Sequence, residues 1–239
     1  MMNTVLEVNI QQAGYHDRSR VVEGIEFSMQ GGELIGLIGP NGAGKSTTIK
    51  AMLGLLQNMQ GTIAFCGPNQ NYGYIPETPI LYDKLTLWEH LELAASAHGM
   101  DEQIFLSRTE ALLAQFHLTD VKHDLPGSFS KGMQQKIMLI IGFLLQPDVY
   151  IVDEPFIGLD PLATRDFLRL LEQEKARGAG ILMSTHVLDT AEKICDSFLL
   201  VNQGSMLARG TLQEIREQCG LPEASLFECF IDLTQKDAQ

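Results

Sequence analysis

The chain has 239 residues and a formal net charge of -13, and 45% of its residues are hydrophobic. This hydrophobic content predicts a packed globular core and excludes an intrinsically disordered chain. The acidic balance weighs against nucleic acid as a partner, because phosphate contacts need a surplus of Lys and Arg, although it leaves room for a local basic patch. We therefore expect one large domain, or one domain with a sizeable insert.

The first part of the chain shows the patterns of strands. Residues 5–10 and 25–29 alternate between apolar and polar, which predicts strands with one solvated face. Residues 34–38 form a nearly continuous apolar run, which is typical of a strand buried on both faces of a parallel sheet. A helix is expected over residues 45–56, and short strands over 61–65 and 72–75.

From residue 86 to residue 145 the pattern becomes helical and no strand signal interrupts it. Leu87, Leu91 and Ala95 fall on one helical face. The longest apolar run, residues 137–145, is far shorter than the roughly 18 residues that a membrane span needs. We interpret this stretch as a helical subdomain inserted into an α/β domain.

Strand patterns return after the helical stretch and alternate with helical ones. Strands are expected over residues 149–152 and 181–184 and in a hairpin around Gly204, and helices over 162–177 and 187–195. This alternation predicts an α/β fold. A single domain over 1–239 would comprise a core of residues 1–85 and 146–210, a helical subdomain of 86–145 and a tail of 211–239.

The most specific motif runs from Gly39 to Thr47. It fits G-x-x-x-x-G-K-[ST] at Gly39, Gly44, Lys45 and Ser46, between a predicted buried strand and a predicted helix. Glycines let successive backbone N–H groups turn toward phosphate oxygens, and the helix N-terminus adds its positive dipole end. Lys45 would reach the β- and γ-phosphates, and the Ser46 hydroxyl would bind Mg²⁺.

A second motif places two carboxylates at the end of a strand. Asp153 and Glu154 directly follow the apolar run of residues 149–152. Asp153 can hold Mg²⁺ through water, and Glu154 can polarise an attacking water. Together with the phosphate loop, the pair indicates a nucleotide hydrolase.

Four further segments resemble motifs of the ABC ATPases in order and spacing. Ser128–Lys136 is similar to the signature motif, Pro155–Asp160 to the D-loop, and Ser184–His186 to the switch histidine, while Pro76–Glu77 stands where the Q-loop stands. Tyr15 lies ahead of the phosphate loop, where the family has an aromatic residue. The resemblance covers residues 4–210 and implies a P-loop NTPase core of ABC type with an inserted helical subdomain and an N-terminal antiparallel β part.

The resemblance also implies a role for each matching residue. ATP would stack on Tyr15 and lie in the loop formed by Asn41, Gly42, Ala43, Gly44, Lys45, Ser46 and Thr47. Glu154 would be the catalytic base, and His186 would hold the γ-phosphate and the water. Mg²⁺ would be bound by Ser46, Asp153 and Glu77.

The family works as head-to-tail dimers, which implies a second copy of this chain as a partner. Ser130 and Gly132 would contact the γ-phosphate bound by the other subunit, and Asp160 would shape the dimer interface. Because every expected hydrolytic residue is present, a homodimer is expected.

Three positions depart from the family pattern. Glu77 replaces a glutamine, Lys131 replaces the first glycine of the signature motif, and Met133 replaces its glutamine. Glu77 keeps an oxygen that can reach Mg²⁺ or water, so we expect it to keep coupling the site to a membrane partner. Lys131 either attracts phosphate or points to solvent, and the sequence does not decide between the two.

The resemblance implies an ATPase subunit that is bound peripherally at the cytoplasmic side of the cell membrane. Its partners would be separate membrane-spanning permease subunits. The motif combination and the segment Ser225–Phe230 resemble the Ecs-type, exporter-like subgroup, which favours export over import. The alternative is a non-transport ABC ATPase that acts on a macromolecular partner.

Overall fold

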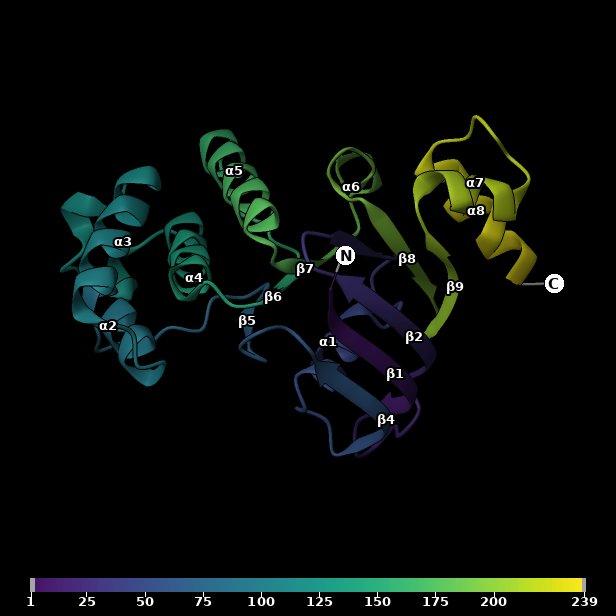
Figure 1. Ribbon diagram of the computed structural model, residues 1–239, viewed down its shortest axis with the longest axis horizontal. Coiled ribbons are helices and arrows are strands. Elements are labelled where there is room, and N and C mark those ends of the chain that lie inside the picture. Colours follow the sequence, from purple (N-terminus) through teal and green to yellow (C-terminus); the bar gives the residue numbers. More distant parts are fainter. Residues whose placement is uncertain (1–2, 238–239) are drawn as a thin grey trace.

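A computed structural model describes residues 3–237 of the chain. Within them the strands form one mixed sheet of nine strands in the order β4-β1-β2-β9-β8-β3-β7-β6-β5 (Figure 1). The strands are β1 (Thr4–Gly14), β2 (Val22–Gln30), β3 (Leu34–Ile38), β4 (Asn58–Phe65), β5 (Tyr72–Ile75), β6 (Val149–Asp153), β7 (Gly180–Thr185), β8 (Ser197–Asn202) and β9 (Ser205–Gly210).

The parallel half of the sheet consists of β5, β6, β7, β3 and β8. Strands β3, β6 and β7 are buried along their whole length, as the continuous apolar runs predict. Because β3, β6 and β7 run parallel, their carboxyl ends meet at one edge of the sheet. The ligand site of an α/β fold is formed at this edge. This arrangement confirms the predicted fold class.

The antiparallel half of the sheet holds the N-terminal strands. Strand β1 pairs antiparallel with β2 and with β4, and β8 with β9 form the predicted hairpin. The turn of that hairpin contains Gly204, with φ of 86°. A Cβ at this position would lie 2.1 Å from the carbonyl oxygen of Val21, so a side chain would break the contact between the turn and β2.

The helices lie on both faces of the sheet and at the two ends of the molecule. Helices α2 to α4 gather beside β5, whereas α7 and α8 lie at the opposite end, next to β9 (Figure 1). The helical elements are α1 (Lys45–Met52), α2 (Leu87–Ala97), α3 (Glu102–Gln115), η1 (Thr119–Val121), η2 (Pro126–Ser128), α4 (Lys131–Leu145), α5 (Pro161–Arg177), α6 (Leu188–Ile194), α7 (Leu212–Cys219) and α8 (Leu226–Asp237).

Helix α1 is shorter than the sequence predicts. The expected helix reaches residue 56, but α1 ends at Met52 and Gly54 adopts φ of 69°. A left-handed glycine just beyond the last turn is a common way to end a helix. Leu55 is 64% exposed, so the apolar residues after the helix do not extend its buried face.

The tail, whose structure the sequence pattern leaves open, folds into α7 and α8. Leu226, Cys229 and Phe230 of α8 are buried in a cluster with Phe198 and Leu200 of β8. Each helix is preceded by a Ser or Thr hydroxyl that accepts a hydrogen bond from the backbone of the first turn. The outer limits of the predicted domain bounds, residues 1–2 and 238–239, lie outside the described residues.

Candidate active site

The phosphate loop connects the end of β3 to the start of α1. Gly42 and Gly44 have φ of 83° and 106°, values that side chains disfavour. A Cβ on Gly39 would lie 2.4 Å from the carbonyl oxygen of Val201 on the neighbouring strand β8. The loop can therefore follow this path only with glycine at these positions, and the path leads directly into the N-terminus of a helix.

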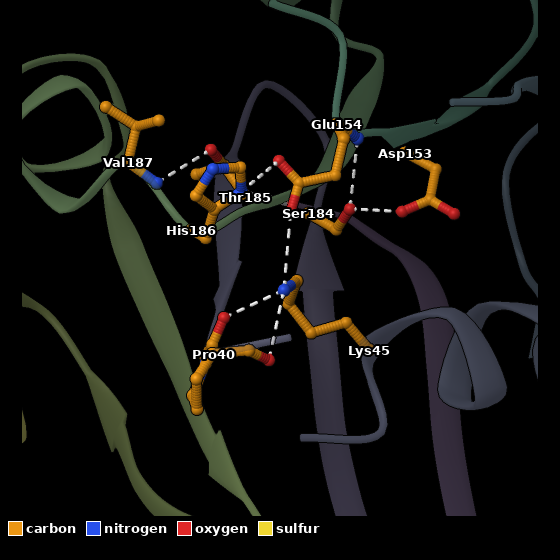
Figure 2. A network of polar contacts seen from close by, with 9 residues as sticks. Pro40, Lys45, Asp153, Glu154, Ser184, Thr185, His186 and Val187 are labelled. Carbon is orange, nitrogen blue, oxygen red and sulfur yellow. Dashed lines mark hydrogen bonds and ion pairs between the residues drawn. The ribbon is translucent and has the colours of Figure 1, made fainter. Parts of the chain in front are cut away.

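Lys45 opens α1 and is 6% exposed. Its Nζ donates a hydrogen bond of 2.8 Å to the carbonyl oxygen of Gly39 and lies 3.3 Å from Oε1 of Glu154. Figure 2 shows the ammonium held between the loop backbone and the carboxylate. A buried ammonium with these two partners is fixed in position before any phosphate is bound.

Glu154 follows β6 and has a left-handed backbone, with φ of 46°. This conformation is costly for a residue with a side chain and is typical of functional sites. The Glu154 N–H donates hydrogen bonds to the carbonyl oxygen and hydroxyl of Ser184, at 3.2 and 3.1 Å. Its Oε2 lies 3.0 Å from Nδ1 of His186 (Figure 2). Oε1 is buried and has no hydrogen bond among the described residues; its partner there is the Lys45 ammonium.

Asp153 lies at the last position of β6, beside Ser184 on β7. The Ser184 hydroxyl donates a hydrogen bond to Oδ1 of Asp153 (Figure 2). Burial raises the pKa of Asp153, and hydrogen bonds from Ser184 and Ser46 oppose that rise. Ser184 was not predicted as a site residue, although it stands directly before Thr185 and His186 in the motif that the sequence singles out.

These groups face a cavity of about 440 Å³. Most of the residues that the sequence predicts for one ATP site line this cavity, and Arg18, Val21, Pro40 and Ile157 line it without having been predicted as site residues. The full lining is Tyr15, Arg18, Val21, Pro40, Asn41, Gly42, Gly44, Lys45, Ser46, Thr47, Glu77, Glu154, Ile157 and His186. Gly39, Ala43 and Asp153, which the sequence also predicts, are not among the lining residues.

Tyr15 stands at the rim of the cavity and is 41% exposed. Its hydroxyl lies 3.4 Å from Oγ1 of Thr47, and Nζ of Lys50 lies 5.5 Å from the centre of its ring. These contacts orient the ring beside the phosphate loop while leaving part of it open. The open part is available for stacking against a base.

The predicted signature and dimer residues lie elsewhere. The Ser130 hydroxyl accepts a hydrogen bond from the Met133 N–H and caps α4. Asp160 caps α5 and forms an ion pair with Lys136 at 2.8 Å. Neither Ser130, Gly132 nor Asp160 lines the cavity, so one chain does not bring them to its own phosphate loop.

A second hollow, of about 640 Å³, lies between β2, β8, β9 and α7. It contains none of the residues of the phosphate loop and neither Glu154 nor His186. Its charged lining residues include Glu33, Glu214 and Arg209, which already bind other atoms of the chain. The smaller cavity is therefore the candidate active site, because the motif residues converge there.

Comparison with known proteins agrees with this assignment. Residues 22–157 match the family model described as "ABC transporter". The chain is 52% identical to "Uncharacterized ABC transporter ATP-binding protein YthP" of Bacillus subtilis and 43% identical to "ABC-type transporter ATP-binding protein EcsA" of the same organism. These matches cover 99% and 98% of this chain, and the same shares of the two relatives.

A solved structure titled "Structure of ATP binding subunit of ABC transporter" superposes with a TM-score of 0.91 at 48% identity. The match covers 97% of this chain and 100% of that chain. Sequence and fold thus agree over nearly the whole chain. The protein belongs to the ATP-binding proteins of the ABC transporter family, and members of this family are ATPases.

Proposed function

We propose that the chain binds and hydrolyses MgATP and couples this reaction to substrate movement through separate membrane-spanning subunits. The observation that carries the proposal is the arrangement of Lys45, Glu154 and His186 around one cavity next to the phosphate loop. A cation for phosphate, a buried carboxylate base and a histidine in contact with that base are the groups that phosphoryl transfer to water requires.

In this proposal Tyr15 stacks against the adenine, and the backbone N–H groups of residues 41–47 bind the phosphates. Lys45 binds the β- and γ-phosphates, which requires its ammonium to exchange part of its contact with Glu154 for phosphate oxygens. That exchange frees Glu154 to accept a proton from the attacking water. His186 holds the opposite oxygen of Glu154 and so orients the carboxylate.

The residues fit a magnesium ion bound together with phosphate. Ser46 and Glu77 line the cavity, and Ser46 is close enough to Asp153 to lower the pKa of that carboxyl. Hard oxygen donors suit Mg²⁺, which usually takes one or two carboxylates and completes its shell with water and phosphate oxygens. Among residues 3–237 no group of three or more His, Cys, Asp or Glu is placed to hold a metal ion. Bound Mg²⁺ would neutralise charge on the transferred phosphate.

The proposed working unit is a dimer of two copies of this chain. Ser130 and Gly132 open α4 away from the cavity, as expected if they serve the nucleotide of the partner subunit. The glycine is required there, because a Cβ on Gly132 would lie 2.6 Å from the carbonyl oxygen of Gly158. Asp160 lies at the N-cap of α5, with its side chain half exposed.

The proposed membrane contact is the segment from Glu77 to Trp88, which leads from the cavity to α2. Ile80 and Tyr82 on this segment are 74% and 64% exposed, whereas Leu87 is fully buried. Among the described residues no helix has the length and apolar character of a membrane span. A peripheral position at the cytoplasmic side of the membrane, on separate permease subunits, follows from the proposal. The proposed domain division keeps residues 86–145 as the helical subdomain.

We further propose export as the direction of transport. The support is the resemblance of Phe129–Met133, Tyr74–Glu77 and Ser225–Phe230 to exporter-like subunits. In inverted vesicles that contain the complex, ATP added outside should drive substrate into the lumen. ATP-driven loss of substrate from the lumen would contradict export.

The test of the main proposal uses Glu154→Gln with a matched control, Glu172→Gln on the exposed face of α5. Loss of a general base lowers rates by about 10²- to 10⁴-fold, so phosphate release should fall at least about 100-fold in Glu154→Gln alone. ATP binding should persist, and light scattering should show a dimer when ATP and Mg²⁺ are present. Hydrolysis at the wild-type rate would refute the assignment of Glu154.

The same trapped variant tests the transporter role. Tagged Glu154→Gln protein with ATP should recover a membrane protein with several spans, in comparable amount, from detergent-solubilised membranes of the source organism. Recovery of soluble partners alone would leave the ATPase chemistry intact and contradict the transporter role.

A further inference from the structure

Arg18 lines the nucleotide cavity together with Tyr15, Lys45 and Glu154, although no motif includes it. It belongs to the connection between β1 and β2. The backbone hydrogen bonds of that connection hold Arg18 at the cavity.

Residues 15–18 form a tight loop that is closed by two backbone hydrogen bonds. The Tyr15 N–H donates to the Arg18 carbonyl oxygen at 2.9 Å, and the Arg18 N–H donates to the Tyr15 carbonyl oxygen at 3.2 Å. The Asn58 amide donates a further hydrogen bond of 3.0 Å to the Tyr15 carbonyl oxygen. The loop also packs on Gly14, where a Cβ would lie 2.2 Å from the Arg18 carbonyl oxygen. Tyr15 and Arg18 are therefore held as a pair at the rim.

The charges that line the cavity show why a second cation matters. The arginine and the lysine of the lining are Arg18 and Lys45, and its carboxylates are Glu77 and Glu154. Lys45 already has Glu154 as its partner at 3.3 Å. In the part of the chain that the structure describes, the Arg18 side chain makes no ion pair, whereas the neighbouring Arg20 pairs with Glu23. Glu77, which replaces the glutamine expected from the family pattern, adds negative charge that a polyanionic ligand must overcome.

We propose that Arg18 is a phosphate-binding residue whose guanidinium contacts the phosphate chain of the nucleotide in this cavity. Arginine suits this role, because its planar fork stays charged and can donate two parallel hydrogen bonds to phosphate oxygens. Arg18 compensates for the carboxylate of Glu77, and its rigid loop places it at a fixed distance from Tyr15. The same loop thus positions the adenine of the nucleotide through Tyr15 and its phosphates through Arg18.

This inference rests on the proposed function, and its test separates the two. Dissociation constants of ATP, ADP and adenosine are measured by calorimetry for the wild type and for Arg18→Ala, Arg18→Lys and the control Arg20→Ala. We expect Arg18→Ala to bind ATP and ADP about tenfold more weakly with adenosine binding unchanged. Arg18→Lys should recover part of the loss, and Arg20→Ala should match the wild type.

Two other results would overturn the inference. Unchanged ATP binding by Arg18→Ala would show that the guanidinium makes no contact, and an equal loss for adenosine would show that the substitution only disturbs the loop. The variant Lys45→Ala tests the proposed function itself, because its ATP binding should be abolished. If Lys45→Ala binds ATP normally, the cavity is not the nucleotide site, and the proposed function fails together with the inference. If only the Arg18 variants behave as wild type, the inference alone fails.

Discussion

Lys45 and Glu154 form a buried ion pair of 3.3 Å across the nucleotide cavity, with side chains 6% and 8% exposed. Lys45 opens α1, which follows β3, and Glu154 follows β6. Strand β7 lies between β3 and β6 in the sheet. Each charge therefore stabilises the other. Phosphate binding must compete with this pair, which links occupation of the site to the release of its base.

Replacing Lys45 by methionine should lower the stability of the nucleotide-free protein. Removing one partner of a buried ion pair typically costs about 3–5 kcal/mol, because the other charge stays buried and unpaired. We expect about 3 kcal/mol, since Glu154 keeps its contact with His186. The double variant Lys45→Met/Glu154→Gln should recover most of this loss. Urea unfolding without nucleotide measures both, and a loss below about 1 kcal/mol in the single variant would contradict this account.

Replacing Ser184 by alanine should slow hydrolysis without weakening ATP binding. The Ser184 hydroxyl donates a hydrogen bond to Asp153 and accepts one from the Glu154 N–H. Its loss leaves the buried Oδ1 of Asp153 without that donor and loosens the backbone of Glu154. We expect kcat to fall about tenfold at constant KM, and stability to fall by about 1–3 kcal/mol. Ser107→Ala, on the exposed face of α3, is the matched control. A rise in KM at constant kcat would assign Ser184 to binding instead.

Replacing Gly39 by alanine should destabilise the phosphate loop. The new Cβ would lie 2.4 Å from the Val201 carbonyl oxygen and 3.0 Å from the Ala43 side chain, so β8 or the loop must move. Overpacking of this kind costs about 1–3 kcal/mol. Gly127→Ala is the control, because a Cβ there meets no atom within 4 Å. Thermal unfolding compares the two variants, and equal midpoints would contradict the contact with β8.

Replacing Glu214 by glutamine should reduce the acid sensitivity of the tail. Hydrogen bonds from the backbone N–H and hydroxyl of Thr211 lower the pKa of Glu214 below its ordinary value of 4.5. Stability from a lowered carboxyl pKa is present above the ordinary pKa and is lost as the pH falls through the lowered one. The advantage of the wild type over Glu214→Gln in unfolding midpoint should therefore be largest near neutral pH and shrink as the pH falls below 4.5. Glu217→Gln, exposed on the same helix, is the matched control.

Local patterns predicted the central elements well and the ends of others poorly. The strands over 34–38 and 72–75 begin and end where their apolar runs do. Helix α1 stops four residues before the predicted end, because Gly54 turns the chain into a left-handed conformation that hydrophobic periodicity does not register. The sequence pattern left the structure of the tail open because α7 and α8 are short. Their buried residues pack on β8, and local hydrophobic periodicity does not show such a tertiary contact.

The sequence by itself determined the phosphate loop, the carboxylates that follow β6 and the family, because each depends on residue types at fixed spacing. The tertiary structure decided which distant side chains meet: Lys45 with Glu154, Glu154 with His186, and Ser184 with Asp153. The physical reason is the strand order β3-β7-β6, which brings three strand ends together at one edge of the sheet. Local periodicity does not encode strand order, and it could not have placed Arg18 at the rim, since that position follows from a loop closed by backbone hydrogen bonds.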